Sequence, residues 1–89
     1  MPRYLTQHTL SCLTRQGAES LAHKLQGGEP VRAGKILVNM LEGKMLVEFS
    51  AASREALEEF LKAEGMHYDW ALRIEWETRA QDGKLHIAE

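Results

Sequence analysis

Apolar residues recur along the chain at two different periods, and the change between these periods predicts the order of elements. Residues 3–11 mix β-forming side chains at a period of two, which predicts a first strand. A helix follows, with Thr14 suited to cap its start and Gly27-Gly28 to end it. The apolar positions of this helix fall at i, i+3, i+4 and i+7: Ala18, Leu21, Ala22 and Leu25.

The middle of the chain predicts a β-hairpin and a second helix. Residues 35–41 and 44–49 have the composition of two strands that fold back at Glu42-Gly43. Ser53 is suited to cap the following helix, and Gly65 ends it. The apolar face of that helix consists of Ala56, Leu57, Phe60 and Leu61.

The last part of the chain completes a β-α-β-β-α-β order. Residues 71–79 predict a strand, Asp82-Gly83 a tight turn, and the remaining residues a return strand or a tail. The right-handed crossover rule folds this order into an α+β, ferredoxin-like sandwich, whose antiparallel sheet has the order 4-1-3-2 and carries both helices on one face. We therefore expect one domain over residues 1–89, with a core at 1–80 and a C-terminal extension at 81–89.

Strand parity predicts which side chains lie under the helices. These are Ile36, Val38, Met40, Met45, Val47, Phe49, Leu72, Ile74 and Trp76. The first strand is ambiguous, but if Leu5 points inward, then His8 lies on the face that the helices leave open. Tyr68 and Trp70 continue the inward parity and are expected to close the core.

The open face is predicted to mix apolar and charged residues. Leu37, Leu41 and Leu46 would be unusual in water, whereas Arg73 and Glu48 would be costly in a dry core. This mixture of apolar and charged residues is typical of a cavity that contains some water and is closed by a second copy of the chain, so we expect a homodimer.

His8 is the centre of the candidate site. With the predicted strand order, Glu48 lies on one side of His8 and Arg73 on the other, and His67 and Asp69 face the same side. The alternative for His8 is a buried network of hydrogen bonds and ion pairs at the dimer interface, and for His67 and Asp69 it is solvent exposure. The predicted ligand-binding residues are His8, Asn39, Glu48, His67, Asp69 and Arg73.

Composition narrows the function classes. The 11 basic and 13 acidic residues are spread along the chain and give a net charge of −2, so no block of Lys or Arg predicts a nucleic-acid partner. No apolar run has the length of a signal peptide or a membrane span. A single cysteine, Cys12, excludes an internal disulfide. We expect a cytoplasmic protein that does not bind membranes.

Three segments carry a family resemblance: the opening "MPRYLTQHTL", the hairpin "GKMLVEFSA" followed by "SREALEEFLKAEG", and the "HYDW" before the last strand. They are similar to a family of small bacterial ferredoxin-like proteins, largely of unknown function, that form dimeric α+β barrels and include nickel-binding members. The resemblance covers residues 1–77 and implies a homodimer with the open sheet faces turned together.

Two classes of function fit these residues. The first is a binding module that holds a small ligand or a divalent metal in the cavity on the open face; His8, Glu48 and His67 would suit nickel or zinc. The second is a small cofactor-free enzyme, in which His8 acts as general acid or base and Arg73 stabilises an oxyanion. We favour the binding module, because it needs only a cavity and convergent polar groups.

Overall fold

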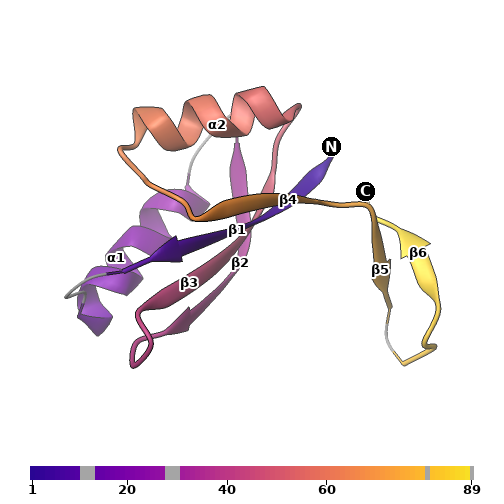
Figure 1. Cartoon of the computed structure of the whole chain (residues 1–89), viewed down its shortest axis with the longest axis horizontal. Coiled ribbons are helices and arrows are strands. Elements are labelled where there is room, and N and C mark those ends of the chain that lie inside the picture. Colours follow the sequence, from indigo (N-terminus) through magenta and orange to yellow (C-terminus); the bar gives the residue numbers. More distant parts are fainter. Residues whose placement is uncertain (11–13, 28–30, 80, 89) are drawn as a thin grey trace.

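The computed structural model describes residues 1–10, 14–27, 31–79 and 81–88 (Figure 1). Its elements are β1 (Arg3–Thr9), α1 (Arg15–Gln26), β2 (Arg32–Asn39), β3 (Lys44–Ser50), α2 (Arg54–Ala63), β4 (Trp70–Ile74), β5 (Trp76–Thr78) and β6 (Leu85–Ile87). Cys12, Gly28 and the predicted end of the first strand at residue 11 lie outside the described residues. Within the described part of the chain, no helix is long and apolar enough to cross a membrane.

Four strands form one antiparallel sheet in the order β2-β3-β1-β4, which confirms the predicted order. β1 lies in the middle and pairs with β3 on one side and β4 on the other. Both predicted helix caps are present: the Thr14 hydroxyl accepts a hydrogen bond from the Gly17 amide, and the Ser53 hydroxyl accepts one from the Ala56 amide. Gly65, with φ of 67°, ends the turn after α2.

The core lies between one face of the sheet and the two helices. Leu25 of α1 and Leu57 and Leu61 of α2 are fully buried against it. The sheet contributes Met45, Val47 and Phe49 from β3, as the parity of that strand predicts, and Tyr4 from β1. We call this the helix face and the opposite side the open face.

The orientation of β1, which the sequence left ambiguous, is the opposite of the one on which the predicted site depends. Tyr4, Thr6 and His8 point to the helix face and are buried, because they lie opposite Phe49, Val47 and Met45 of β3. Leu5 is therefore on the open face. Residues facing each other across antiparallel strands share one side of the sheet, so the register fixes this assignment.

The predicted parity of β4 is also reversed. Leu72 lies opposite Leu5 on the open face and is 56% exposed, and Trp70, opposite Gln7, is 39% exposed. The space beneath α2 is occupied instead by Tyr4 and by Tyr68, which comes from the segment before β4. Ala71, opposite Thr6, is the small residue that β4 turns toward this space.

The predicted strand over residues 71–79 is divided at Glu75. β4 stays in the main sheet, whereas β5 turns away and pairs with β6, so the C-terminal extension is a separate two-stranded hairpin. Its turn contains Gly83 with φ of 66°, and the Asp82 carboxylate accepts a hydrogen bond from the Lys84 amide at 2.9 Å. Figure 1 shows this hairpin projecting from the end of β4, apart from the layers of the main domain.

Candidate functional site

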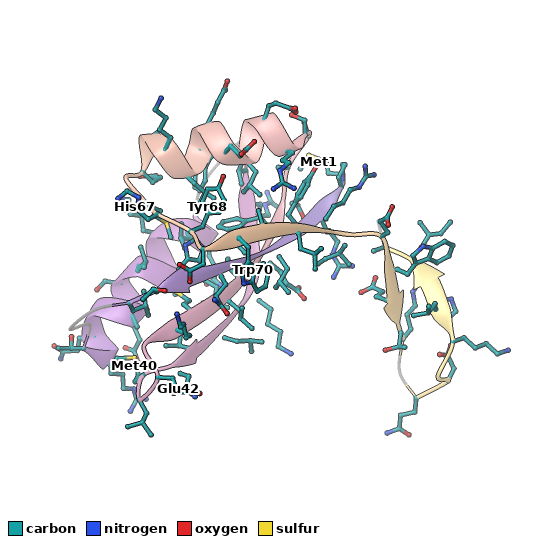
Figure 2. All side chains as sticks on the ribbon, in the orientation of Figure 1. Met1, Met40, Glu42, His67, Tyr68 and Trp70 are labelled. Atoms are coloured by element: carbon teal, nitrogen blue, oxygen red, sulfur yellow. The ribbon has the colours of Figure 1, made fainter. Side chains whose placement is uncertain are left out.

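The open face of the sheet carries several apolar side chains that neither α1 nor α2 covers. Leu37, Trp70 and Leu72 are exposed, and Leu5 and Leu46 lie between them at intermediate burial. Figure 2 shows Trp70 on the side of β4 away from α2, whereas Tyr68 lies beneath that helix. Leu41, the third leucine predicted on this face, is instead almost fully exposed in the β2–β3 turn.

One end of this face is hollowed. A shallow depression of about 480 Å³ lies next to the β2–β3 turn. Its lining comes from β1, β2, β3 and the turn: Gln7, Leu37, Val38, Asn39, Glu42, Lys44 and Leu46. It therefore combines an aliphatic surface with amide and charged groups, as small-molecule sites do.

Asp69 joins the polar groups at this end. Its Oδ2 atom accepts hydrogen bonds from the Thr9 hydroxyl at 2.7 Å and from the Gln7 side-chain amide at 3.1 Å, and lies 3.7 Å from the Lys44 ammonium. The hydrogen bond from Thr9, followed by that from Gln7, lowers the pKa of Asp69 below its usual range. The backbone amide of Asp69 also donates to the Gln7 carbonyl at 2.7 Å, which fixes the start of β4 against β1.

Lys44 connects this cluster to Asn39. The two residues lie opposite each other in β3 and β2, and the Lys44 ammonium also donates to the Thr9 hydroxyl at 2.9 Å. The Asn39 side chain is engaged at both ends: its amide nitrogen donates to the Glu42 carboxylate at 2.8 Å and its oxygen accepts from the Glu42 backbone amide at 2.9 Å. Asn39 thus holds the β2–β3 turn that forms one wall of the depression.

His8 is a buried core residue, with 2% of its surface exposed. Its Nδ1 atom is 2.8 Å from the His67 carbonyl, which can only accept, so Nδ1 carries a proton and donates. In the neutral ring Nε2 then accepts from the Thr6 hydroxyl at 2.7 Å. Burial lowers the pKa of His8, although the hydrogen bond to His67 opposes this shift. His8 therefore belongs to a hydrogen-bond network in the core of the domain, on the helix face and not at the open face where the predicted network lay. Both ring nitrogens are engaged, which leaves neither of them free to act as general acid or base.

Glu48 and Arg73 lie on opposite faces of the sheet. Glu48, opposite Leu5, is on the open face, 3.7 Å from the Arg3 guanidinium. Arg73, opposite Tyr4, is on the helix side and lines a surface depression near Ser53 at the start of α2. The predicted grouping of Glu48, His8 and Arg73 around one point is therefore wrong, because it required the other orientation of β1 and β4.

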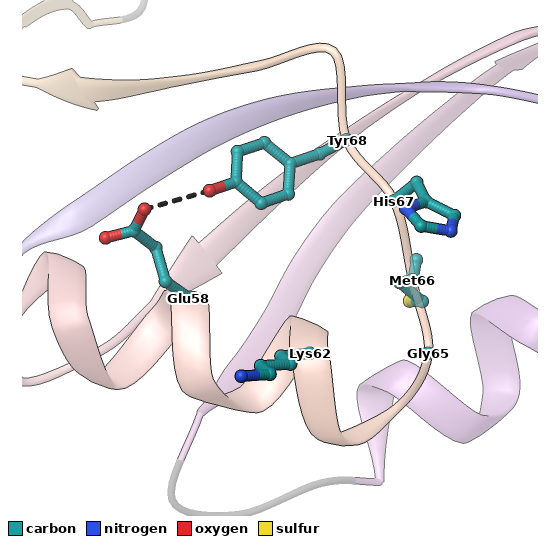
Figure 3. A pocket seen from close by; sticks show the side chains of 6 residues that line it. All are labelled: Glu58, Lys62, Gly65, Met66, His67 and Tyr68. Carbon is teal, nitrogen blue, oxygen red and sulfur yellow. Dashed lines mark hydrogen bonds between the residues drawn. The ribbon is translucent and has the colours of Figure 1, made fainter.

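His67 belongs to a second depression on the helix side, of about 390 Å³ (Figure 3). Lys62 and Glu58 of α2 form its other wall, and the Tyr68 hydroxyl donates to the Glu58 carboxylate at 2.9 Å. That hydrogen bond raises the pKa of Tyr68 above its usual value. The His67 side chain is exposed, whereas its carbonyl group holds His8.

The structure therefore brings together part of the predicted ligand set. Asn39 and Asp69 both lie at the hollowed end of the open face, each next to Lys44, and Glu48 lies further along that face. His8, Arg73 and His67 are elsewhere. Over the described ranges, with their gaps at 11–13, 28–30, 80 and 89, no three His, Cys, Asp or Glu residues are grouped closely enough to hold a metal ion.

Sequence reasoning missed Gln7, Thr9 and Lys44, although all three belong to the polar cluster. Gln7 and Thr9 alternate with His8 in β1, so the parity that placed His8 on the open face excluded both of them. Lys44 has the same outward parity as Leu46 in β3, and this signal was available from the sequence.

The element order and the strand order define a ferredoxin-like α+β domain with an added C-terminal hairpin. In comparisons with family models, curated proteins and solved structures, none matches this chain.

Proposed function

We propose that this protein is a homodimeric binding module, in which two copies turn their open faces together and hold a small organic ligand between them. The observation that supports this proposal is the open face itself, which combines exposed Leu37, Trp70 and Leu72 with a polar cluster at one end. Contiguous exposed apolar patches that are bordered by polar residues often mark sites where a protein binds a partner or a ligand.

The lining favours a ligand with an apolar body and at least one hydrogen-bond acceptor. Leu37 and Leu46 provide aliphatic contact, and the donors Gln7 and Lys44 lie beside them. Both donors now interact with Asp69, so an acceptor on the ligand would compete with that carboxylate. The competition favours a ligand with a localised negative charge or a strongly polar oxygen.

The positions of His8, Glu48 and His67 support a metal site less well than the open face supports a site for an organic ligand. Nickel or zinc bound by His8, Glu48 and His67 would require His8 to leave the core and to break both of its hydrogen bonds. Metal analysis of protein purified without a chelator or an affinity tag tests this directly. Nickel or zinc at one equivalent per chain or per dimer would favour the metal, and substoichiometric amounts would remove it.

Sedimentation equilibrium tests the dimer. We expect a mass of twice 10.1 kDa at micromolar concentrations. A species of 10.1 kDa whose mass does not change with concentration would contradict the dimer and the shared cavity.

An apolar anionic dye, anilinonaphthalene sulfonate, tests the ligand site. We expect Lys44→Ala to weaken dye binding about three- to tenfold, because a hydrogen bond to a charged group contributes about 1.5–3 kcal/mol before the solvent exposure of Lys44 is allowed for. Lys62→Ala is the matched control, since Lys62 lines the depression on the other side of the sheet. If Lys62→Ala weakens binding and Lys44→Ala does not, the site is the helix-side depression.

A further inference from the structure

A surface depression on the helix side of the sheet gathers two arginine side chains, Arg54 of α2 and Arg73 of β4. It has a volume of about 400 Å³ and lies where the start of β1, the end of β4 and the start of α2 meet (Figure 1). Over residues 1–10, 14–27, 31–79 and 81–88, neither guanidinium makes a hydrogen bond or an ion pair. The depression therefore offers two charged groups whose N–H donors are unused within the described chain.

Tyr4 supplies a hydroxyl group to the same depression. It lines the depression from β1, opposite Arg73, and only 4% of its surface is exposed. Among the described residues its hydroxyl makes no hydrogen bond, although every fully buried side-chain nitrogen or oxygen in that part of the chain has a partner. The small exposed part of Tyr4 therefore includes the hydroxyl oxygen, which opens on the depression. An unpaired polar group at the end of an otherwise buried side chain indicates a hydrogen-bond partner from outside the chain.

The start of α2 adds backbone donors to this depression. The Ser53 hydroxyl accepts from the Ala56 amide, and the Ser53 carbonyl accepts from the Leu57 amide at 3.2 Å. The amides of Arg54 and Glu55 lie before the first intrahelical hydrogen bond, and no described residue accepts from them. The N-terminal end of a helix also carries a partial positive charge, which favours an anion at this place.

We propose that this depression binds the phosphate group of a small phosphorylated molecule. A phosphate monoester has three terminal oxygens that accept hydrogen bonds, and guanidinium groups bind such oxygens through paired N–H donors. Arg54, Arg73, the Tyr4 hydroxyl and the free amides together offer more donors than a carboxylate could use. The volume of about 400 Å³ lies within the usual range of small-molecule sites, roughly 300–1,000 Å³, and is larger than a free phosphate ion needs. This site is on the opposite side of the sheet from the open face, so it does not depend on the proposed dimer.

Glu55 is the acidic residue that lines this depression, and its charge opposes an anion. It lies in the first turn of α2, where its carboxylate interacts favourably with the helix dipole. A bound phosphate group would meet one like charge and two opposite charges, so the balance favours binding. Removal of the Glu55 charge should therefore strengthen binding, whereas removal of either arginine charge should weaken it.

Amide NMR spectra of the full-length protein, titrated with phenyl phosphate in a buffer free of phosphate, test the site. We expect saturable shifts of the Arg54 and Glu55 amide signals, and inorganic phosphate should shift the same signals at higher concentration. Sodium chloride at matched ionic strength is the control, and equal shifts with chloride would overturn the site. Saturable shifts confined to the open face would assign phosphate to that face instead. Equal affinity for the two phosphate probes would replace the phosphorylated molecule by the free ion.

Single arginine variants test the two guanidinium groups. Arg73→Ala and Arg54→Ala should each weaken phenyl phosphate binding about three- to tenfold, because each removes charge-assisted hydrogen bonds at an exposed site. Arg79→Ala is the matched control, since it removes the same charge after β5, outside the main sheet. If Arg79→Ala weakens binding as much as the other two variants, general charge attraction explains the binding and the site is overturned.

Two further variants test the hydroxyl and the opposing carboxylate. Tyr4→Phe removes a hydroxyl that has no partner among the described residues, so the free energy of unfolding should stay at the wild-type value. Its affinity for phenyl phosphate should fall about two- to fivefold, as expected for one neutral hydrogen bond. Glu55→Gln should act in the opposite direction and strengthen binding about two- to fivefold. A Tyr4→Phe protein that loses stability but keeps its affinity, or a Glu55→Gln protein that binds more weakly, would overturn this assignment of donors and charges.

Discussion

Both faces of the four-stranded sheet combine apolar and polar residues, but the two helices cover only one of these faces. On the helix face, Thr6 and His8 lie among apolar side chains and are hydrogen-bonded to each other, and His8 also donates to the His67 carbonyl. On the open face, Gln7 and Thr9 lie on the same side of β1 as Leu5, and their hydrogen-bond partner Asp69 is exposed. The polar residues of both faces have partners in the same chain, so the comparison shows that cover by the helices, and not the presence of a partner, decides which of these residues are buried.

The largest difference should appear when one aromatic side chain is truncated on each face. Phe49→Ala should lower the free energy of unfolding by about 3–5 kcal/mol, because Phe49 is 1% exposed and packs edge-on against Phe60. Trp70→Ala should cost less than half of that in dilute protein, since its ring is only partly covered. Urea unfolding at several protein concentrations measures both changes. Equal losses in dilute protein would mean that Trp70 is a core residue after all.

Trp70 also shows how far the sequence predicts this fold. The order of elements, both helix caps and the final hairpin could be predicted, because each depends on local spacing and on turn chemistry. The strand order then followed from the right-handed crossover rule. Alternation in β4 correctly grouped Leu72 with Ile74 and Trp70. It could not determine whether that apolar side meets the helices of its own chain or remains uncovered.

The candidate site was harder to predict, because it depends on the orientation of β1. Both sides of β1 carry apolar and polar residues, Tyr4 with Thr6 and His8 on one side and Leu5 with Gln7 and Thr9 on the other. Their alternation therefore favours neither orientation. The orientation follows from the register with β3, in which Tyr4 and His8 lie opposite Phe49 and Met45. This pairing joins residues far apart in the sequence and has no local signal.

His8→Ala should give the next largest effect. We expect a loss of about 2–4 kcal/mol in the free energy of unfolding, because the substitution leaves a cavity and removes the partners of Thr6 and the His67 carbonyl. Thermal and urea unfolding measure it, and Thr9→Ala on the open side of the same strand is the control. A His8→Ala protein as stable as wild type would show that His8 does not belong to the core.

The pH dependence of stability should distinguish His8 as well. Because burial lowers the pKa of folded His8, the unfolded chain binds more protons below the ordinary histidine pKa of about 6.5. The free energy of unfolding should be insensitive to this group above that pH and should fall as the pH decreases below it. In the protonated ring Nε2 would become a donor, and the Thr6 hydroxyl would have to turn to the Val47 carbonyl at 3.5 Å.

His8→Gln is the matched variant for this measurement, since an amide keeps a donor and an acceptor but does not titrate. Urea unfolding between pH 5 and pH 7.5, at one fixed protein concentration, should show a shallower slope for His8→Gln than for wild type. Identical slopes would mean that His8 is protonated equally easily in the folded and unfolded states.

The smallest effects should appear at Asp69 on the open face, and the quantity to measure there is the pKa of its carboxyl group. The hydrogen bond from Thr9 is the largest cause of its lowered pKa, that from Gln7 is second, and the charge of Lys44 contributes less. Thr9→Val should therefore raise the pKa of Asp69 most, Gln7→Ala less, and Lys44→Met least. Carboxyl carbon shifts in NMR spectra recorded as a function of pH measure all three pKa values.

Because the folded pKa is lowered, Asp69 stabilises the fold above its ordinary pKa, and this contribution is lost as the pH falls through the folded value. If Lys44→Met raises the pKa of Asp69 more than Thr9→Val does, charge determines the state of this carboxylate, and a ligand anion would compete with it mainly for Lys44.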